Sequence, residues 1–209
     1  MSICTRFGFM LGWFLLPVLG SAQVIKPELI MTESGGTLVF NTAESFFAVD
    51  VAGDKLLPAP NTDGFFQVDA RLIRLVNTPQ RELARDIGQR VLMPKELLQM
   101  QFRHDLDEEQ FNLQRPITTT KQEYITTPKG RLVLHWWLEL PGSSDRSVTQ
   151  RHYMSTICDR QVLTASAPLL PNDTQEELRS YLIKVMLSVR ESDDPINVTE
   201  YAKELQSDK

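Results

Sequence analysis

The chain has 209 residues, of which 42% are hydrophobic and 23% are charged, and its formal net charge is −5 at pH 7. This length and composition fit one globular domain and exclude a collagen-like, low-complexity or largely disordered protein. The mildly acidic balance does not indicate a nucleic-acid-binding surface, so we expect no nucleic-acid partner.

The N-terminal segment has the features of a secretory signal peptide. Arg6 is its only charged residue, an apolar run follows over 7–19, and small residues end the segment at Ala22. This order is typical of a cleaved signal, and the apolar run is shorter than the roughly 20 residues of a membrane-spanning helix. We expect residues 1–22 to be removed, which leaves a periplasmic or secreted chain without a transmembrane segment. The alternative is a buried core helix.

Cleavage would leave Cys158 as the only thiol, because Cys4 lies in the signal segment. An exported protein that depended on disulfides would carry an even set of cysteines, so we expect this one to depend on its hydrophobic core. We interpret Cys158 as a buried structural residue. The alternative is a nucleophile paired with His135 or His152, which would require an exposed thiolate beside a base.

Residues 23–36 are expected to form an extended segment before a single α+β domain that spans 37–190. Strand patterns begin with the short apolar run 37–40 and continue over 46–51 and 65–76, which are rich in β-branched and aromatic residues. Turn-forming residues separate these runs. We therefore predict three strands in this part of the chain.

The pattern becomes helical from Thr78, which is the expected N-cap, with Pro79 as the first helical residue. Pro94 interrupts the helix and begins a second one that continues to residue 111. The carboxylates at the end of this second helix lack the spacing of a calcium-binding loop, so we interpret them as solvent-exposed surface. They are Asp105, Asp107, Glu108 and Glu109.

Four strands are predicted next, over 117–126, 130–140, 147–158 and 161–170. Short connections between consecutive strands favour antiparallel pairing. We therefore expect an antiparallel meander.

An amphipathic helix is predicted after the meander, with Asn172 or Asp173 as its N-cap. Its apolar residues recur with helical spacing, so we expect them to cover the sheet. They are Leu178, Tyr181, Leu182, Val185, Met186 and Val189. Residues 191–209 are polar and are expected to form a C-terminal tail with a loose turn or short helix.

The hairpin in the middle of the meander contains the candidate binding residues. If its turn is centred near Ser143–Ser144, residues whose numbers sum to about 288 face each other. One face then carries aromatic rings beside a guanidinium, which suits a ligand or a cation–π contact. Its residues are His135, Trp137, Arg151 and Tyr153. The opposite face, assigned to the core, consists of Leu132, Leu134, Trp136, Met154, Thr156 and, by the same register, His152.

Two alternatives apply to this candidate face. A helix can cover it, because a sheet with long apolar strands is usually covered on both faces. A shift of the register by one residue would also exchange the two faces.

Sequence motifs for catalysis or metal binding are absent. No two histidines have the i, i+4 spacing of a zincin helix, and the chain has no Cys-x-x-Cys, G-x-S-x-G, Walker or G-x-G-x-x-G motif. We therefore predict no catalytic residue, no metal ligand and no cofactor.

The order of elements over 151–190 resembles the C-terminal half of the PsbP-like fold family. A strand over 153–158, a second strand over 162–167 that ends at a proline, and an amphipathic helix over 178–188 match the pattern of that family. The resemblance covers about residues 37–190. It implies an antiparallel sheet between helical layers, an α/β/α sandwich, used for binding or assembly rather than catalysis. It transfers no ligand residues.

These observations favour an exported, non-enzymatic binding or accessory protein of the cell envelope or extracellular space, whose partner is a protein or an envelope component. One alternative is a hydrolase or transferase with a site built from His135, Tyr153 and Arg151, which predicts titratable groups that converge in a pocket. The other is a carrier that holds a small apolar ligand between the sheet and the last predicted helix.

Overall fold

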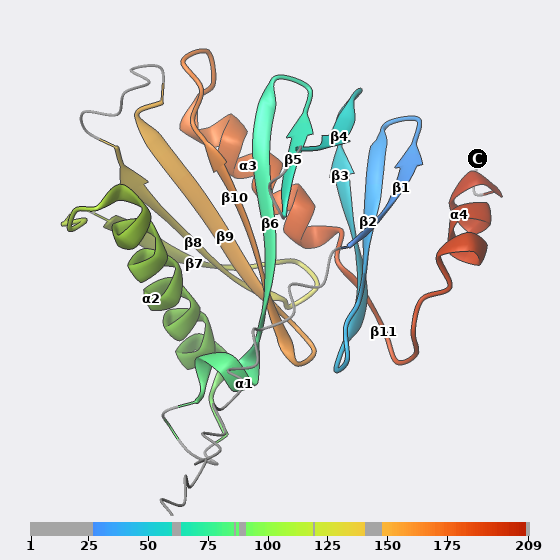
Figure 1. The fold of residues 1–209 in the computed structure, drawn as a ribbon, viewed down its shortest axis with the longest axis horizontal. Coiled ribbons are helices and arrows are strands. Elements are labelled where there is room, and N and C mark those ends of the chain that lie inside the picture. Colours follow the sequence, from blue (N-terminus) through green and yellow to red (C-terminus); the bar gives the residue numbers. More distant parts are fainter. Residues whose placement is uncertain are drawn as a thin grey trace, which may run out of the picture.

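A computed structural model describes six parts of the chain, namely residues 27–59, 64–85, 87, 91–118, 120–140 and 148–207. In these parts the chain forms an α+β fold of two antiparallel sheets and four helices (Figure 1). None of the described helices has an apolar stretch long enough to cross a membrane. The predicted signal segment 1–22 and the turn at Ser143–Ser144 lie outside the described residues.

The smaller sheet is built from both ends of the described chain. Its strands are, in spatial order, β1 (Glu28–Thr32), β2 (Gly35–Asn41), β3 (Phe46–Ala52) and β11 (Arg190–Ser192). Strand β1 lies in the segment expected to precede the domain, and most of β11 lies in the expected tail. Both flanking segments therefore pair with the predicted strands rather than extend away from them.

The larger sheet contains the predicted meander at one side. Its strands are, in spatial order, β4 (Leu56–Pro58), β5 (Phe65–Val68), β6 (Arg71–Pro79), β10 (Gln161–Pro168), β9 (Gln150–Cys158), β8 (Leu132–Glu139) and β7 (Thr120–Thr126). All neighbours in this sheet are antiparallel. The four-stranded meander is thus confirmed as β7 to β10.

The single strand predicted over 65–76 is wrong, because the chain reverses direction between β5 and β6. Asp69 adopts a left-handed backbone with φ of 53°, a conformation that aspartate tolerates in turns. Its side chain also accepts a hydrogen bond from the backbone N–H of Lys55 at 2.8 Å. The apolar residues around the turn concealed it, since no Gly, Pro or Asn marks this position in the sequence.

The four helices are α1 (Gln80–Leu83), α2 (Pro94–Leu113), α3 (Gln175–Leu187) and α4 (Val198–Ser207). Helix α1 begins one residue later than predicted, because Thr78 still pairs with Val162 in the sheet and Pro79 is the N-cap. Helix α2 begins at Pro94, as predicted.

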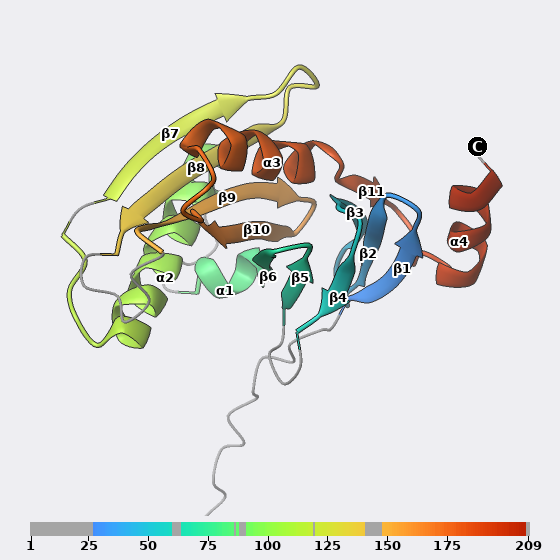
Figure 2. The same cartoon turned by 90° about the horizontal axis from the view of Figure 1, so that it is seen from above.

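Helices α2 and α3 cover opposite faces of the larger sheet (Figure 2). The predicted apolar residues of α3 are buried against this sheet and the inner face of the smaller sheet, with Tyr181 partly buried. Helix α4 packs on the other face of the smaller sheet through Tyr201, Ala202 and Leu205. The main core therefore lies where α3 meets both sheets.

The N-cap of α3 is Thr174, not Asn172 or Asp173. The hydroxyl of Thr174 accepts a hydrogen bond from the N–H of Glu177, and the Glu177 carboxylate accepts one from the Thr174 N–H, which forms a capping box. Asp173 is used elsewhere, in an ion pair with Arg71 at 2.7 Å.

Replacing Thr174 with alanine should lower the free energy of unfolding by about 1 kcal/mol, because it leaves a helix N–H without its acceptor. Urea denaturation measures the change. The matched control is Asn172→Ala, which should have almost no effect because Asn172 is exposed and precedes the cap. A larger loss from Asn172→Ala than from Thr174→Ala would contradict this assignment.

Candidate binding site

The register of the β8–β9 hairpin separates the four candidate binding residues. Trp136 pairs with Tyr153 and Trp137 pairs with His152, so the numbers of paired residues sum to 289 rather than 288. Because this sum is odd, each even-numbered residue of one strand pairs with an odd-numbered residue of the other. His135 and Trp137 therefore do not share a face with Arg151 and Tyr153, and the predicted shared face is wrong. Arg151 and Tyr153 lie on the face covered by α2.

His135 and Trp137 lie on the face covered by α3, where they meet His152. Nδ1 of His135 lies 2.8 Å from Oε1 of Glu123, and its Nε2 lies 3.0 Å from Nδ1 of His152. Trp137 stacks on both imidazole rings, with ring centroids 4.8 and 5.6 Å away. Glu123 also accepts a hydrogen bond from Nε of Arg179 on α3 at 2.8 Å. The histidines therefore form a buried polar cluster that joins the sheet to the helix.

The two histidines are kept neutral by their burial. Burial lowers the pKa of His135, and burial together with the neighbouring His135 lowers the pKa of His152 to about 4. Both side chains are almost completely inaccessible, at 2% and 1% exposure. Glu123 can only accept hydrogen bonds, so it fixes the proton of neutral His135 on Nδ1 and leaves Nε2 to accept from His152.

On the opposite face, Arg151 forms an ion pair with Glu109 of α2. Nη1 of Arg151 lies 2.9 Å from both carboxylate oxygens. Beside this pair, Trp136 and Tyr153 stack with ring centroids 3.9 Å apart. Burial raises the pKa of Tyr153 well above its usual value. This face is thus also closed by a helix.

The interpretation of the acidic end of α2 as solvent-exposed surface is wrong for Asp105 and Glu109. Both are buried, because they follow Gln101 at four-residue intervals on the side of α2 that faces the sheet. Asp105 accepts a hydrogen bond from Nε2 of Gln101 at 2.7 Å. Burial raises the pKa of Asp105. The burial of Glu109 could not be recognised from local sequence, since its partner Arg151 is distant in the chain.

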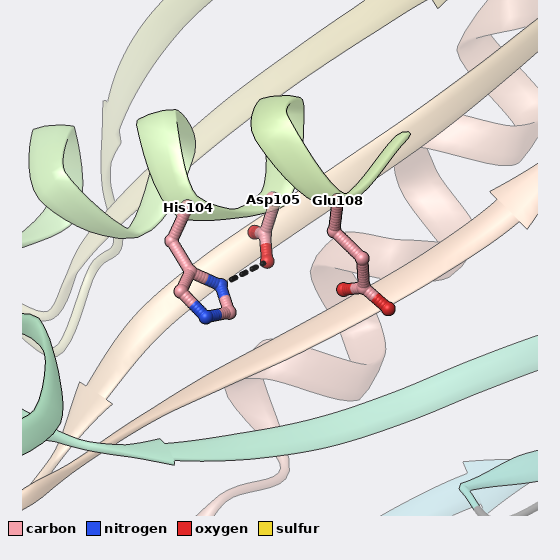
Figure 3. Close-up of side chains that lie close together, drawn as sticks. All are labelled: His104, Asp105 and Glu108. Atoms are coloured by element: carbon pink, nitrogen blue, oxygen red, sulfur yellow. Dashed lines mark ion pairs between the residues drawn. The ribbon is translucent and has the colours of Figure 1, made fainter. Parts of the chain in front are cut away.

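A cluster of potential metal ligands lies on α2 beside these residues, formed by His104, Asp105 and Glu108 (Figure 3). Their ligand atoms lie within 4.8 Å of one another, and Nδ1 of His104 is 3.7 Å from Asp105. The neighbouring carboxylate of Asp105 raises the pKa of His104. Glu108 is paired with Arg74 of β6 at 2.6 Å. These residue types could hold a divalent cation, but their present contacts are those of an ion-pair network between α2 and the sheet.

Cys158 lies at the end of β9 and is fully buried. Burial raises the pKa of its thiol to about 12. A thiol in this environment is protonated at neutral pH and is not accessible to a substrate. The geometry therefore agrees with the structural interpretation of this cysteine.

An open pocket of about 430 Å³ lies at the end of the larger sheet, where the β7–β8 turn meets the C-terminal end of α3 and strand β11. It is lined by Pro94, Thr127, Lys129, Gly130, Arg131, Leu132, Thr156, Ile157, Leu187, Val189 and Glu191. Sequence reasoning missed this pocket, because its walls come from segments that are far apart in the chain and carry no common motif.

Comparison with known proteins finds no family model that matches the chain, and no curated protein matches it. The function therefore has to be argued from the geometry of the described residues. Among the described residues, the geometry includes a polar cluster under a helix on each face of the larger sheet and an open pocket at the end of this sheet.

Replacing Glu109 with glutamine should lower the free energy of unfolding by about 2–3 kcal/mol, because the Glu109 carboxylate is only 4% exposed and both of its oxygens lie 2.9 Å from Nη1 of Arg151. Chemical denaturation measures the loss. The control is Glu108→Gln, which breaks the more exposed pair with Arg74 and should cost about 1 kcal/mol or less. Equal effects of the two changes would show that Glu109 is not the buried partner of Arg151.

The histidine cluster should make the protein less stable as the pH falls from about 6.5 to 4. The pKa of folded His152 is about 4, below the ordinary 6.5, so the unfolded chain takes up the proton first. The free energy of unfolding then decreases by up to about 1.4 kcal/mol per pH unit for this group. Proton NMR should find the midpoint of His152 near 4. A titration midpoint near 6.5 would contradict the burial of His152. The variant His152→Gln should lose less stability than the original protein as the pH falls.

Proposed function

We propose that the chain is an exported, non-enzymatic binding protein of the cell envelope or extracellular space. The observation that favours binding over catalysis is where the side chains of His135, His152 and Cys158 lie. His135 and His152 are buried under α3 and are hydrogen-bonded to each other. Cys158 is buried with a protonated thiol. Each of these groups supports the fold at its position, and none of them faces the open pocket.

The alternative hydrolase site is opposed by the hairpin register. It would need His135 to act beside Arg151 and Tyr153, but the sheet itself separates His135 from these two residues. A proton transfer between groups requires hydrogen-bond reach, or one bridging water. This arrangement supports binding rather than acid–base chemistry at the hairpin.

The pocket favours ligand carriage as a second candidate function. It lies at the C-terminal end of α3, between this helix and the sheet, which is close to where an apolar-ligand carrier was expected. Its volume of about 430 Å³ falls within the range of ligand pockets. It differs from a purely apolar ligand site because Lys129, Arg131 and Glu191 are among its lining residues.

The predicted signal segment and the resemblance to PsbP-like proteins support the same proposal. The signal would direct the chain out of the cytoplasm. The family resemblance implies a role in binding or assembly, and helices on both faces of the larger sheet are compatible with the sandwich that it implies. The partner is a protein or an envelope component.

The test is expression of the full chain with a C-terminal tag in a secretion-competent bacterial host. We expect an exported product that begins at Gln23, captures an envelope component in a saturable way, and does not turn over ester, phosphomonoester or peptide substrates. Untagged protein should compete for the captured component, because a specific site saturates.

The matched control for export is Leu15→Arg, which places a charge in the apolar run and should keep the uncleaved chain in the cytoplasm. Retention of residues 1–22 in an exported, folded protein would contradict the export proposal. Reproducible turnover that is lost in His135→Gln or Cys158→Ser would contradict the non-enzymatic one.

A further inference from the structure

The pocket at the end of the larger sheet has the chemistry of a site for a small amphiphilic anion. We propose that it binds a molecule with one negative charge on an apolar body, held by Lys129 and Arg131 at the charged side. This inference rests on the proposed binding function and assigns it a place and a class of ligand.

The pocket is lined by apolar and by charged side chains, which we call its apolar side and its charged side. The apolar side chains come from the sheet, from the end of α3 and from the start of α2, and they are Pro94, Leu132, Ile157, Leu187 and Val189. The charged side is formed by the β7–β8 turn and by Glu191 of β11. A ligand that is apolar throughout would leave the charged side unused, and a small inorganic anion would leave the apolar side unused.

Arg131 is held rigidly at the boundary between these two sides. Its Nη1 donates to the carbonyl oxygen of Ile157 at 2.8 Å, and its Nη2 lies 2.8 Å from a carboxylate oxygen of Glu191. The contact with Glu191 shows that a carboxylate fits against this guanidinium. This guanidinium is therefore positioned to bind an anionic group of a ligand in place of the Glu191 carboxylate.

Lys129 carries a positive charge that no carboxylate of the pocket balances, because Glu191 is paired with Arg131. Its side chain is exposed at the pocket, and no carboxylate among the described residues pairs with it. Lys129 and Arg131 against Glu191 leave the pocket with a single net positive charge. A singly charged anion therefore matches it, and a divalent cation does not.

The β7–β8 turn fixes this charged side before any ligand arrives. The backbone N–H of Thr127 donates to Arg131 and that of Gly130 donates to Thr127, both at 2.9 Å, and the N–H of Arg131 donates to the Thr127 hydroxyl at 3.0 Å. Gly130 has φ of 79°, and no atom lies within 4 Å of where its Cβ would be. The pocket is thus preformed and open beside Gly130, which reduces the entropy lost on binding.

The test uses two dyes that differ mainly in charge. Anilinonaphthalene sulfonate carries one negative charge on an aromatic body, and N-phenyl-1-naphthylamine has the same aromatic system without the sulfonate. Fluorescence titration of the full chain should give saturable binding of the sulfonate at one site, and weaker binding of the neutral dye. Dodecanoate, an aliphatic monoanion, should displace the sulfonate.

Variants of the charged side should change the affinity in opposite directions. Lys129→Gln should weaken sulfonate binding about three- to fivefold, because it removes the unbalanced charge. Glu191→Gln should strengthen it by a similar factor, because it removes the competing carboxylate. The control Lys121→Gln changes an exposed lysine of β7 outside the pocket and should have no effect. Circular dichroism confirms that each variant is folded.

The inference is overturned if the sulfonate does not bind, if the neutral dye binds as tightly, or if Lys129→Gln and Lys121→Gln behave alike. These outcomes leave the proposed function intact when the chain still captures an envelope component. Substrate turnover would refute the proposed function whatever the dyes do, so the two failures are distinguishable.

Discussion

The pairing register of β8 with β9 determines which polar groups each helix must cover. Trp136 opposite Tyr153 places these rings under α2, and Trp137 opposite His152 places the histidines under α3. A shift by one residue would exchange the faces of one strand and bring a charged arginine under α3. The helices are therefore matched to the sheet through polar as well as apolar contacts.

Each covering helix brings charged side chains that complement groups of the larger sheet. Helix α2 contributes Glu109 to Arg151, and α3 contributes Arg179 to Glu123. Burial of a charge is costly unless it is paired and hydrogen-bonded, so an exchange of the two helices would leave carboxylates and guanidiniums unpaired. The apolar stripes alone would not make this distinction, because hydrophobic contacts have no direction. The ion pairs thus favour the observed side for each helix.

The sequence predicted the elements well where local patterns determine them. The meander and the stripe of α3 were recognisable, because alternation and helical spacing persist over their whole length. The turn at Asp69 was missed because apolar residues continue on both sides of it. The burial of Glu109 was missed because its charge is balanced by Arg151, whose position opposite α2 depends on tertiary structure.

The candidate site was only partly predictable, because its geometry also depends on tertiary structure. His135, Trp137, Arg151 and Tyr153 do belong to the central hairpin, but one residue of register decided whether they share a face. The hairpin turn lies outside the described residues, and no sequence motif fixes its centre. The pocket at the sheet end had no local pattern, since Arg131 and Glu191 are far apart in the chain and come together only in the tertiary structure.

Strand β11 connects this pocket to the rest of the molecule. Glu191 points to Arg131 in the pocket, whereas its neighbour Arg190 pairs with Asp50 and donates to the hydroxyl of Tyr201 on α4. Alternate side chains of a strand lie on opposite faces, so β11 contacts the pocket through Glu191 and helix α4 through Arg190. Its backbone pairing with β3 and the Arg190 contacts hold the strand independently of Glu191. An anion that displaced the Glu191 carboxylate from Arg131 would therefore exchange one exposed ion pair for another without releasing β11, which makes the charged side of the pocket available to a ligand at little cost to the fold.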